Sequence, residues 1–402
     1  MKITVMSIFF PPERGAAPSR IMSMCKAMQA RGCDVEVITA LANYPKGKLF
    51  DEYSGKLFVK EEIEGVKCRR YWLYPSNSNN PFVRVFSMFS FSLSLLFSLP
   101  YLIHRKSDIV IVQSPPLLVG LIGSWLGRLV GGKVITNVSD IWPKTALELG
   151  VVSKGISYSF FELIERWMYE ASHGLMAQSQ QTVKYLQGVQ DKPTFLYYNL
   201  TDRFPFNGKE LDKTEFKIVY AGLLGIAQGI HQICEEIDFH ELNTTFHIYG
   251  DGQERSRIET YVKENDKRGI FLHKSIPKSE ISEMLAGFHA TIVPLKKPIY
   301  GALPSKIFMA IGSQLPIFFS GEGEGRSLVE QKGIGWVSPS NDYRRLEANI
   351  KKAVSEAGEY ETKKANIARA LTDDFNYDSA QDELLKFLKE QTQRKRGDHT
   401  SI

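Results

Sequence analysis

The sequence predicts a mixed α/β protein with two doubly wound domains, each built on a parallel sheet. Short apolar runs, typical of buried strands, alternate with helical patterns along most of the chain. The alternation occurs twice, before and after a polar segment at residues 199–213 that contains Pro205 and Gly208. The chain has 402 residues, whereas one hydrophobic core stops growing at roughly 250–300 residues. Two domains joined by a linker are therefore expected.

The first domain is expected at residues 1–200. Its strand-like runs lie at 3–8, 35–39, 109–113, 134–138, 174–177 and 195–198. Its helical patterns lie at 19–31, 116–130, 156–171 and 180–187. A hairpin with strands at 57–63 and 66–73, turning at Glu64 and Gly65, interrupts this alternation.

The second domain is expected at residues 206–375. Its strands are predicted at 217–221, 245–249, 270–272, 290–294 and 315–319, and its helices at 228–238, 254–267 and 278–287. A last amphipathic helix, at 376–395, is expected to pack back on the first domain. Ligands of doubly wound sheets bind beyond the carboxyl ends of the strands, so both sites are expected there.

Residues 298–308 carry the features of an anion site at a helix start. Pro304 suits the first turn of a helix, because its missing N–H has no partner there. The N–H groups of Ser305, Lys306 and Ile307 are then expected to point out of the helix, where the dipole favours an anion. Lys306 adds a full positive charge at that place.

A second amide-rich turn is predicted at residues 321–325, after the strand at 315–319. Its glycines allow the backbone to approach a ligand closely, and successive amides there form an anion-binding nest. The residues expected to contact the ligand are Gly321, Gly323, Glu324 and Gly325. The lysine and the two turns together predict a diphosphate site.

Five segments, in order and in both halves, resemble a known family. They are FFPPERGAAPSR (9–20), SDIWPKTALELGV (139–151), VYAGLLGIAQGI (219–230), YGALPSKIF (300–308) and SGEGEG (320–325). The chain resembles the retaining glycosyltransferases of family 4, in particular a bacterial subgroup. That subgroup builds lipid-linked surface polysaccharides, such as O-antigen or capsule, commonly from UDP-linked N-acetylated amino sugars.

The resemblance implies a GT-B fold, in which two Rossmann-like domains flank an interdomain cleft and the second domain holds most of the sugar nucleotide. It also implies retention of anomeric configuration, with no cofactor and no metal. The sequence agrees in having no Asp-x-Asp pair to hold a metal-bound diphosphate. Leaving-group charge must then be met by Lys306, helix N-termini and amides. Further donor contacts are expected at Gly222, Gly225, Gln228 and His273.

The chain departs from the family pattern at two places. Many members carry two glutamates where this chain has Gly301 and Met309, and the second of them contacts the ribose. Glu322 or Glu324 is a hypothetical substitute. The turn at 222–228 also lacks the usual cation, which places more of the charge stabilisation on Lys306.

The acceptor side is expected after the first strand and after the strand at 134–138. Arg20 follows the turn that begins at Gly15, a place where phosphate meets a helix N-terminus. Glu13 is a weaker candidate. Asp140 follows the strand at 134–138 directly, either as a helix N-cap or beside the acceptor hydroxyl as an orienting group or base.

The run from Val85 to Ile103 has no charged residue and is flanked by Arg84 and by His104-Arg105-Lys106. A membrane span and a buried helix are both conceivable, but the favoured interpretation is an apolar helix lying in the bilayer interface. The first 205 residues carry 23 Lys and Arg against 16 Asp and Glu, which suits anionic headgroups.

Composition limits the other classes. The four cysteines show no metal-ligand spacing, which predicts reduced thiols, and the N-terminus has no cleavage site of a signal peptide. A cytoplasmic protein, peripheral on the inner membrane, is therefore expected. The scattered basic residues do not predict nucleic-acid binding.

The favoured function is transfer of an N-acetylated amino sugar from a UDP-sugar to a polyprenyl-diphosphate-linked glycan. A UDP-sugar 2-epimerase is the enzymatic alternative. A catalytically silent sugar-nucleotide-binding scaffold is the other, because both family glutamates are missing.

Overall fold

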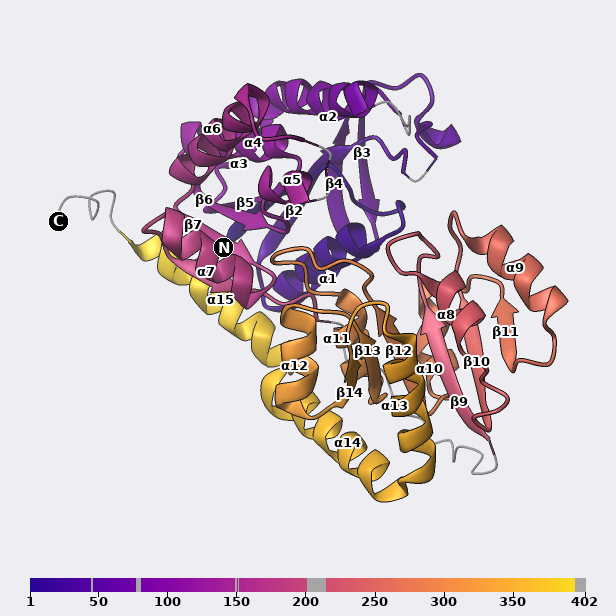
Figure 1. Ribbon diagram of the computed structural model, residues 1–402. Helices are drawn as coiled ribbons and strands as arrows, with labels where there is room; N and C mark the ends of the chain where they lie inside the picture. The colour runs from indigo at the N-terminus through magenta and orange to yellow at the C-terminus, as the bar shows by residue number, and fades with distance from the viewer. Residues whose placement is uncertain (45, 77–80, 149, 151, 201–214, 395–402) are drawn as a thin grey trace. The chain divides into compact units, whose positions relative to one another are not determined.

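The computed structural model describes residues 1–402 except 45, 77–80, 149, 151, 201–214 and 395–402 (Figure 1). The chain divides into two compact units. The first comprises Met1–Tyr198 and Ser379–Ile402, and the second comprises Asn199–Asp378. Most of the predicted linker at 199–213 lies outside the described residues.

The first unit contains an eight-stranded sheet in the order β3-β4-β2-β1-β5-β6-β7-β8. Its strands are β1 (Lys2–Met6), β2 (Asp34–Ala40), β3 (Phe58–Ile63), β4 (Val66–Tyr71), β5 (Ile109–Ser114), β6 (Lys133–Val138), β7 (Gly174–Ala177) and β8 (Thr194–Leu196). All neighbours are parallel except β3 and β4, which form the predicted hairpin. The strand order reverses between β1 and β5, which is where such sheets bind ligands.

Helices cover both faces of this sheet. They are α1 (Ala16–Ala30), α2 (Pro81–Ser94), α3 (Leu99–Arg105), α4 (Leu117–Leu129), α5 (Lys144–Glu148), α6 (Ile156–Ala171), α7 (Gln180–Val189) and α15 (Tyr377–Gln393), with 3₁₀ turns η1 (Asp51–Tyr53) and η2 (Leu95–Ser98). Figure 1 shows α2, α4 and α6 on one side of the sheet and α1, α7 and α15 on the other.

The apolar run at 85–103 becomes α2, η2 and α3, and it packs on the sheet. Phe91, Leu95 and Leu102 are fully buried in the core cluster of the first unit, together with residues of β5 and α4. By length and composition alone, the helical stretch Phe86–Arg105 is sufficient to cross a membrane. The burial of these three side chains is what holds the stretch against the sheet.

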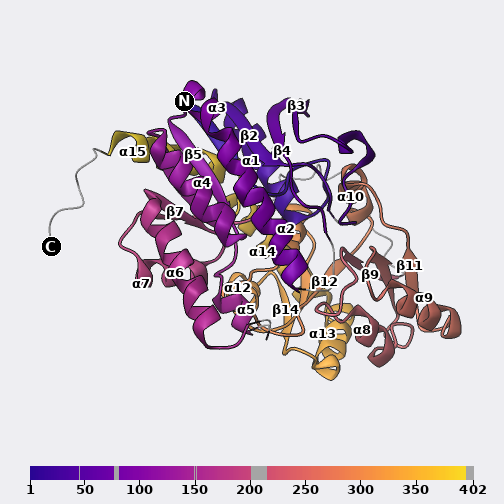
Figure 2. The same ribbon diagram turned by 90° about the horizontal axis from the view of Figure 1, so that it is seen from above.

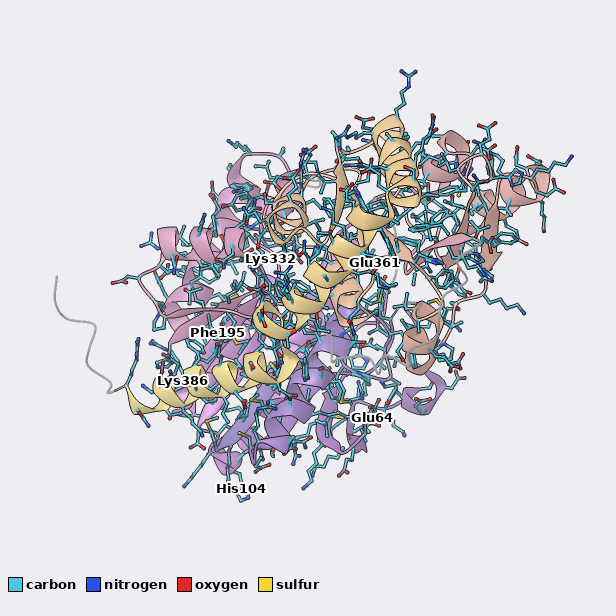
Figure 3. All side chains as sticks on the ribbon, turned by 90° about the horizontal axis from the view of Figure 1, so that it is seen from below. Glu64, His104, Phe195, Lys332, Glu361 and Lys386 are labelled. Atoms are coloured by element: carbon cyan, nitrogen blue, oxygen red, sulfur yellow. The ribbon has the colours of Figure 1, made fainter. Side chains whose placement is uncertain are left out.

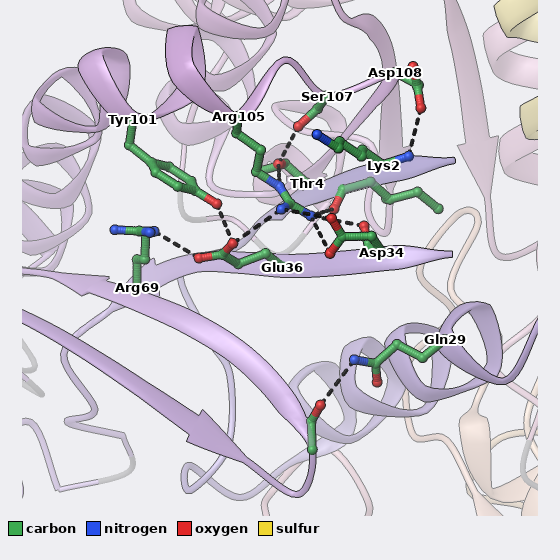
Figure 4. A network of polar contacts seen from close by, with 12 residues as sticks. Lys2, Thr4, Gln29, Asp34, Glu36, Arg69, Tyr101, Arg105, Ser107 and Asp108 are labelled. Atoms are coloured by element: carbon green, nitrogen blue, oxygen red, sulfur yellow. Dashed lines mark hydrogen bonds and ion pairs between the residues drawn. The ribbon is translucent and has the colours of Figure 1, made fainter. Parts of the chain in front are cut away.

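The C-terminal end of this run is anchored by a polar network at the edge of β1 and β2 (Figure 4). Arg105 of α3 forms ion pairs with Asp34 at 3.1 Å and with Glu36 at 3.3 Å. The Tyr101 hydroxyl donates to the same Glu36 carboxylate, which also pairs with Arg69 at 2.8 Å. Arg105 is therefore engaged in holding α3 on the sheet.

Three glycines bring α4 close to the sheet and to α6. A Cβ atom on Gly123 would lie 2.8 Å from Val112 Cγ1, and one on Gly127 would lie 2.7 Å from Val134 Cγ2. A Cβ atom on Gly120 would lie 2.3 Å from the sulfur of Met168 in α6. The glycine face of α4 therefore points inward, whereas the side chains of Trp125 and Leu129 are exposed.

The second unit contains a six-stranded parallel sheet in the order β11-β10-β9-β12-β13-β14, the strand order of a Rossmann fold. Its strands are β9 (Phe216–Ala221), β10 (Thr244–Tyr249), β11 (Ile270–His273), β12 (Ala290–Pro294), β13 (Ile317–Ser320) and β14 (Gly335–Ser338). Its helices are α8 (Ile230–Glu236), α9 (Arg255–Glu264), α10 (Lys278–Leu285), α11 (Ser305–Gly312), α12 (Glu324–Lys332), α13 (Tyr343–Ser355) and α14 (Ala357–Arg369), the last followed by a π-helical turn at Ala370–Asp374.

The predicted α/β class and the repeated alternation of strands and helices are confirmed. Some boundaries differ for local reasons. The strand expected from residue 315 begins at Ile317, because the Leu315 N–H donates to Ala310 and Pro316 has no N–H. The helix expected from residue 228 begins at Ile230, after the left-handed Gly229 at φ 64°.

Helix α15 extends to Gln393, and its residues from Ser379 onward belong to the first unit (Figures 2 and 3). Phe387 stacks on Phe195 with ring centroids 5.1 Å apart. The Tyr197 hydroxyl donates to Gln381 at 3.0 Å, and Arg31 pairs with Asp382 at 2.6 Å.

Candidate functional site

Lys306 lies in the first turn of α11, which begins at Ser305 after Pro304. Its ammonium group is 5.1 Å from the centroid of the Tyr220 ring. It also lies against the turn after β9, where a Cβ atom on Gly222 would be 2.3 Å from Nζ. The absent side chain of Gly222 is what leaves room for the lysine.

Lys306 is a cation without a carboxylate partner in the described part of the chain. Burial lowers the pKa of Lys306 to about 8, because a buried ammonium has lost the water that stabilises its charge. The positive end of the α11 dipole adds to this local potential. A bound anion would relieve both effects, so the arrangement is suited to a phosphate group.

One part of the predicted anion site is wrong. The N–H of Ile307, expected to be free, donates to the Pro304 carbonyl at 3.0 Å, and the Ile307 side chain is buried. The helix start tightens into a turn there and uses this amide internally. The amides of Ser305 and Lys306 remain the candidates for anion contact.

The glycine-rich turn at 321–325 leads into a second helix start, because α12 begins at Glu324. Residue 323 has a positive φ of 85°, a backbone conformation that favours glycine. Gly321 and Gly325 are required by packing, since a Cβ atom on either would lie 3.1 Å or 2.8 Å from the Phe319 ring. The predicted nest of all these amides is wrong in one member, because the Gly321 N–H donates to the Ser338 carbonyl at 3.0 Å.

The turn at 222–228 is fixed from behind by the loop after β10. The Gly222 N–H donates to the Tyr249 carbonyl at 2.8 Å, and the Leu224 N–H donates to the backbone carbonyl of Asp251 at 2.9 Å. The side-chain oxygen of Gln228 is buried and accepts no hydrogen bond from the described residues. A Cβ atom on Gly225 would lie 2.8 Å from that oxygen, so a side chain at residue 225 would crowd it.

His273, predicted to contact the donor, ends β11 within a row of stacked rings. Its ring lies 4.2 Å from that of Tyr249, and its Nε2 is 3.0 Å from Nδ1 of His247. Desolvation lowers the pKa of His273 below its ordinary value. A neutral ring in such a stack is suited to lie beside another flat ring, and donor contact by His273 stays a prediction.

The two positions where the family carries glutamates differ in their backbone. Gly301 has φ at 78°, so a glutamate there would be strained in this loop conformation. Met309 is half-buried within α11. Of the proposed substitutes, Glu322 forms an ion pair with Arg326 at 3.1 Å, and Glu324 lies in the first turn of α12.

Arg20 and Asp140 form the candidate site of the first unit, at the carboxyl ends of β6 and β7. The Arg20 guanidinium donates to Gln178 Oε1 and to Ser139 Oγ, each at 2.9 Å. Burial lowers the pKa of Arg20 to about 10, although Tyr197 and Asp140 oppose the shift. Burial also raises the pKa of Asp140, and here Arg20 opposes it. The two groups therefore influence each other electrostatically.

Glu13 has a structural role that the sequence did not indicate. Its buried carboxylate accepts hydrogen bonds from the backbone N–H groups of Phe10 at 3.2 Å and of Asn43 and Tyr44 at 2.9 Å. These bonds join the loop after β1 to the loop after β2. Gly15 ends the first of these loops as the residue before α1, with φ at 145°.

Sequence reasoning missed several polar residues at the same edge of the sheet. Ser139 and Gln178 hold Arg20, as described above. Gln113 and Asn137, the next-to-last residues of β5 and β6, form a buried amide pair, with Asn137 Nδ2 donating to Gln113 Oε1 at 2.9 Å. The signal was available, because these uncharged polar residues lie at or next to the ends of the apolar runs at 109–113, 134–138 and 174–177.

Comparison with known proteins identifies the class. The model of the glycosyl transferase 4-like domain matches residues 15–195, and that of glycosyl transferases group 1 matches residues 203–371. Sucrose-phosphate synthase from Thermosynechococcus elongatus superposes with a TM-score of 0.73 at 16% identity, covering 97% of this chain and 98% of that one. HepE of Anabaena, in complex with UDP, gives 0.70 at 14%, covering 97% and 100%. The protein therefore has the GT-B fold.

The chain belongs to the GT-B glycosyltransferases, with a domain of the 4-like type followed by one of group 1. A curated relative is WcaI of Escherichia coli strain K12, which is named for glycosyl transfer in colanic acid biosynthesis. It is 24% identical over 376 residues, covering 88% of this chain and 92% of WcaI.

Proposed function

We propose that the protein is a retaining glycosyltransferase that moves an N-acetylated amino sugar from a UDP-sugar to a polyprenyl-diphosphate-linked glycan. The reaction belongs to bacterial surface polysaccharide synthesis, of the O-antigen or capsule type, on the cytoplasmic face of the inner membrane. The resemblance of five motifs to family 4, and the relationship to a protein named for colanic acid biosynthesis, support this assignment.

The observation that carries the proposal is the Lys306 ammonium at the start of α11, which lies against Gly222 and pairs with no carboxylate among the described residues. As the bond from sugar to phosphate breaks, negative charge develops on the departing diphosphate. Lys306 and the N–H groups of Ser305 and Lys306 stabilise that charge more strongly than they stabilise the intact donor. No metal is needed in this scheme, which makes chelator resistance an expected property.

The acceptor hydroxyl attacks on the face from which the diphosphate leaves, so anomeric configuration is retained. Its proton passes to an oxygen of the departing phosphate. Asp140 orients the hydroxyl, and Arg20 is held by Ser139 and Gln178 to contact an anionic group of the acceptor. Replacement of Asp140 by Asn should lower turnover about 10²-fold or more while leaving UDP affinity unchanged. Equal losses in both quantities would contradict this role.

Calorimetric titration with UDP, and then with UDP-N-acetylglucosamine, tests the donor site. Both should bind with and without chelator, and Lys306→Ala should abolish binding. Lys351→Ala, which removes an exposed lysine from α13 of the same unit, is the matched control. Failure of both nucleotides to bind the wild-type protein would overturn the assignment of the donor.

A sugar-nucleotide-binding scaffold without activity is a second candidate, and the absence of both family glutamates favours it. The two candidates differ in one measurement. Incubation with labelled UDP-N-acetylglucosamine and bacterial lipid-linked glycans should give a labelled lipid product whose new bond keeps the configuration of the donor. Binding of UDP with no transfer from any UDP-N-acetylhexosamine would favour the scaffold.

A further inference from the structure

Two helices of the first unit present apolar stripes to solvent, where helices that cover a sheet normally carry polar residues. On α4 the stripe consists of the exposed Trp125 and Leu129 and the half-buried Leu118 and Ile122. On α6 it is Ile156, Phe160, Leu163 and Trp167. The exposed fraction reaches 53% at Trp125, 71% at Leu129 and 94% at Ile156. We call these eight residues the α4–α6 surface.

The two stripes form one continuous surface. Helices α4 and α6 lie side by side in Figures 1 and 2, because Gly120 lets α4 approach Met168 of α6. Trp125 and Trp167 line the same shallow hollow, together with Arg128 and Glu170. An exposed contiguous apolar surface of this kind is unusual on a soluble unit and marks an interaction site.

Helices α2 and α3 extend this surface on the other side of α4, against which they pack. Large apolar side chains of α2, of α3 and of the 3₁₀ turn η2 between them are exposed, with the exposed fraction of Phe97 in η2 reaching 77%. The exposed members are Phe86, Phe89, Leu93, Leu96, Phe97 and Ile103. Phe91 of the same run is fully buried, so it belongs to the core and not to the surface.

The charges beside the surface select an anionic partner. Between Glu64 and Asp140 the chain contains eight Lys and Arg residues and a single acid, Asp108. Three of the eight, Arg69, Arg70 and Arg105, pair with carboxylates within the unit, whereas Arg128 of α4 and Lys106 after α3 are exposed. That acid accepts a hydrogen bond from the Lys2 amide at 2.6 Å. Helices α2, α3 and α4 therefore carry no acidic residue, whereas α6 carries both signs, including the Arg166–Glu170 pair at 2.9 Å. Apolar stripes with tryptophans and flanking cations are typical of a bilayer interface.

We propose that the α4–α6 surface, together with the exposed residues of α2 and α3, docks on an anionic phospholipid bilayer. The tryptophans lie among the headgroups, and Arg128 and Lys106, both exposed, contact lipid phosphates. This inference deepens the proposed function, because a lipid-linked acceptor gives the docking its purpose. Its physical basis is independent of the donor site.

Flotation of the full chain with vesicles tests the surface. The protein should float with phosphatidylethanolamine vesicles that contain phosphatidylglycerol, and much less with phosphatidylcholine alone. The variant Trp125→Glu/Trp167→Glu should lower the ratio of bound to free protein about tenfold or more. The matched control is Leu57→Glu, which changes a residue of the same unit that is 72% exposed and should float like the wild type. UDP titration of each variant reports separately on folding and on the donor site.

A second variant separates insertion from loss of folding. Trp125→Phe/Trp167→Phe should still float, but quenching of its remaining tryptophan emission by brominated lipids should fall well below the wild-type value. Absent flotation of the wild type, or equal flotation of the glutamate variant, would overturn the proposal. So would a concentration-dependent dimer that the glutamate variant abolishes, because the surface would then serve a second copy of the chain. In each case the UDP titration would still test the donor site independently of the membrane surface.

Discussion

At the scale of single residues, Gly222 determines where the Lys306 ammonium lies. A Cβ atom at residue 222 would be 2.3 Å from Nζ, and φ there is 149°. Gly222→Ala should therefore displace Lys306 and weaken UDP binding about tenfold or more, as for loss of a charge-assisted hydrogen bond. Gly131→Ala, at another glycine with positive φ but with open space around it, is the control. Calorimetry with UDP measures both, and unchanged affinity in Gly222→Ala would contradict the contact.

The pKa of Lys306 gives the donor site a pH dependence. The folded-state pKa of about 8 lies below the ordinary value of 10.5, so the lysine loses its charge as pH rises through 8. A diphosphate binds the protonated form, which raises the pKa of Lys306 in the complex. UDP affinity should therefore fall with rising pH above 8, approaching about tenfold per pH unit.

The measurement is the dissociation constant of UDP from pH 7.5 to 9.5 at constant ionic strength. Binding by Lys306→Arg, whose guanidinium keeps its charge over this range, should lack the decline. An equal decline in the wild type and in this variant would assign the effect to another group.

At the scale of secondary-structure elements, the glycine face of α4 sets how closely the helix packs on β5. Gly123→Ala places a Cβ atom 2.8 Å from Val112, which should lower the free energy of unfolding by about 1–3 kcal/mol. Gly188→Ala in α7 meets no atom within 4 Å, so helix propensity should make it neutral or slightly stabilising. Urea denaturation measures both, and similar effects of the two substitutions would show that the packing of α4 is looser than described.

The elements themselves were largely predictable, because strand and helix periodicity depends on local sequence. Helix α6 and strands β7 and β12 begin and end at the expected residues. Hydrogen bonds made within the tertiary structure were not predictable. The Gly321 N–H donates to the Ser338 carbonyl, and the Glu13 carboxylate accepts hydrogen bonds from two loops. The spacing of residues along the sequence indicates neither set of partners.

The candidate sites show the same division. Residue types, the expected helix start after Pro304 and the carboxyl ends of strands led to Lys306, Arg20 and Asp140 as candidates, and their roles stay predictions. The reason that Lys306 has room, which is Gly222, depends on the approach of two turns that lie far apart along the chain. Likewise, Ser139 and Gln178 became relevant once the structure placed them on Arg20.

At the scale of the whole molecule, the chain returns to the first unit after completing the second. Leu384 and Leu388 of helix α15 are fully buried, and Phe387 stacks on Phe195 of β8. This contact joins the end of the chain to a sheet formed by its first 198 residues. Stability of the first unit should therefore depend on residues that follow the second.

Leu384→Ala should lower the free energy of unfolding by about 2–5 kcal/mol, because it leaves a cavity under α15. Lys386→Ala, on the exposed side of the same helix (Figure 3), should change it by less than about 0.5 kcal/mol. Calorimetry with and without saturating UDP identifies the unit affected, since UDP stabilises only the unit that binds it. The transition lowered by Leu384→Ala should be the one that UDP does not raise. A shift confined to the UDP-sensitive transition would show that α15 stabilises the second unit instead.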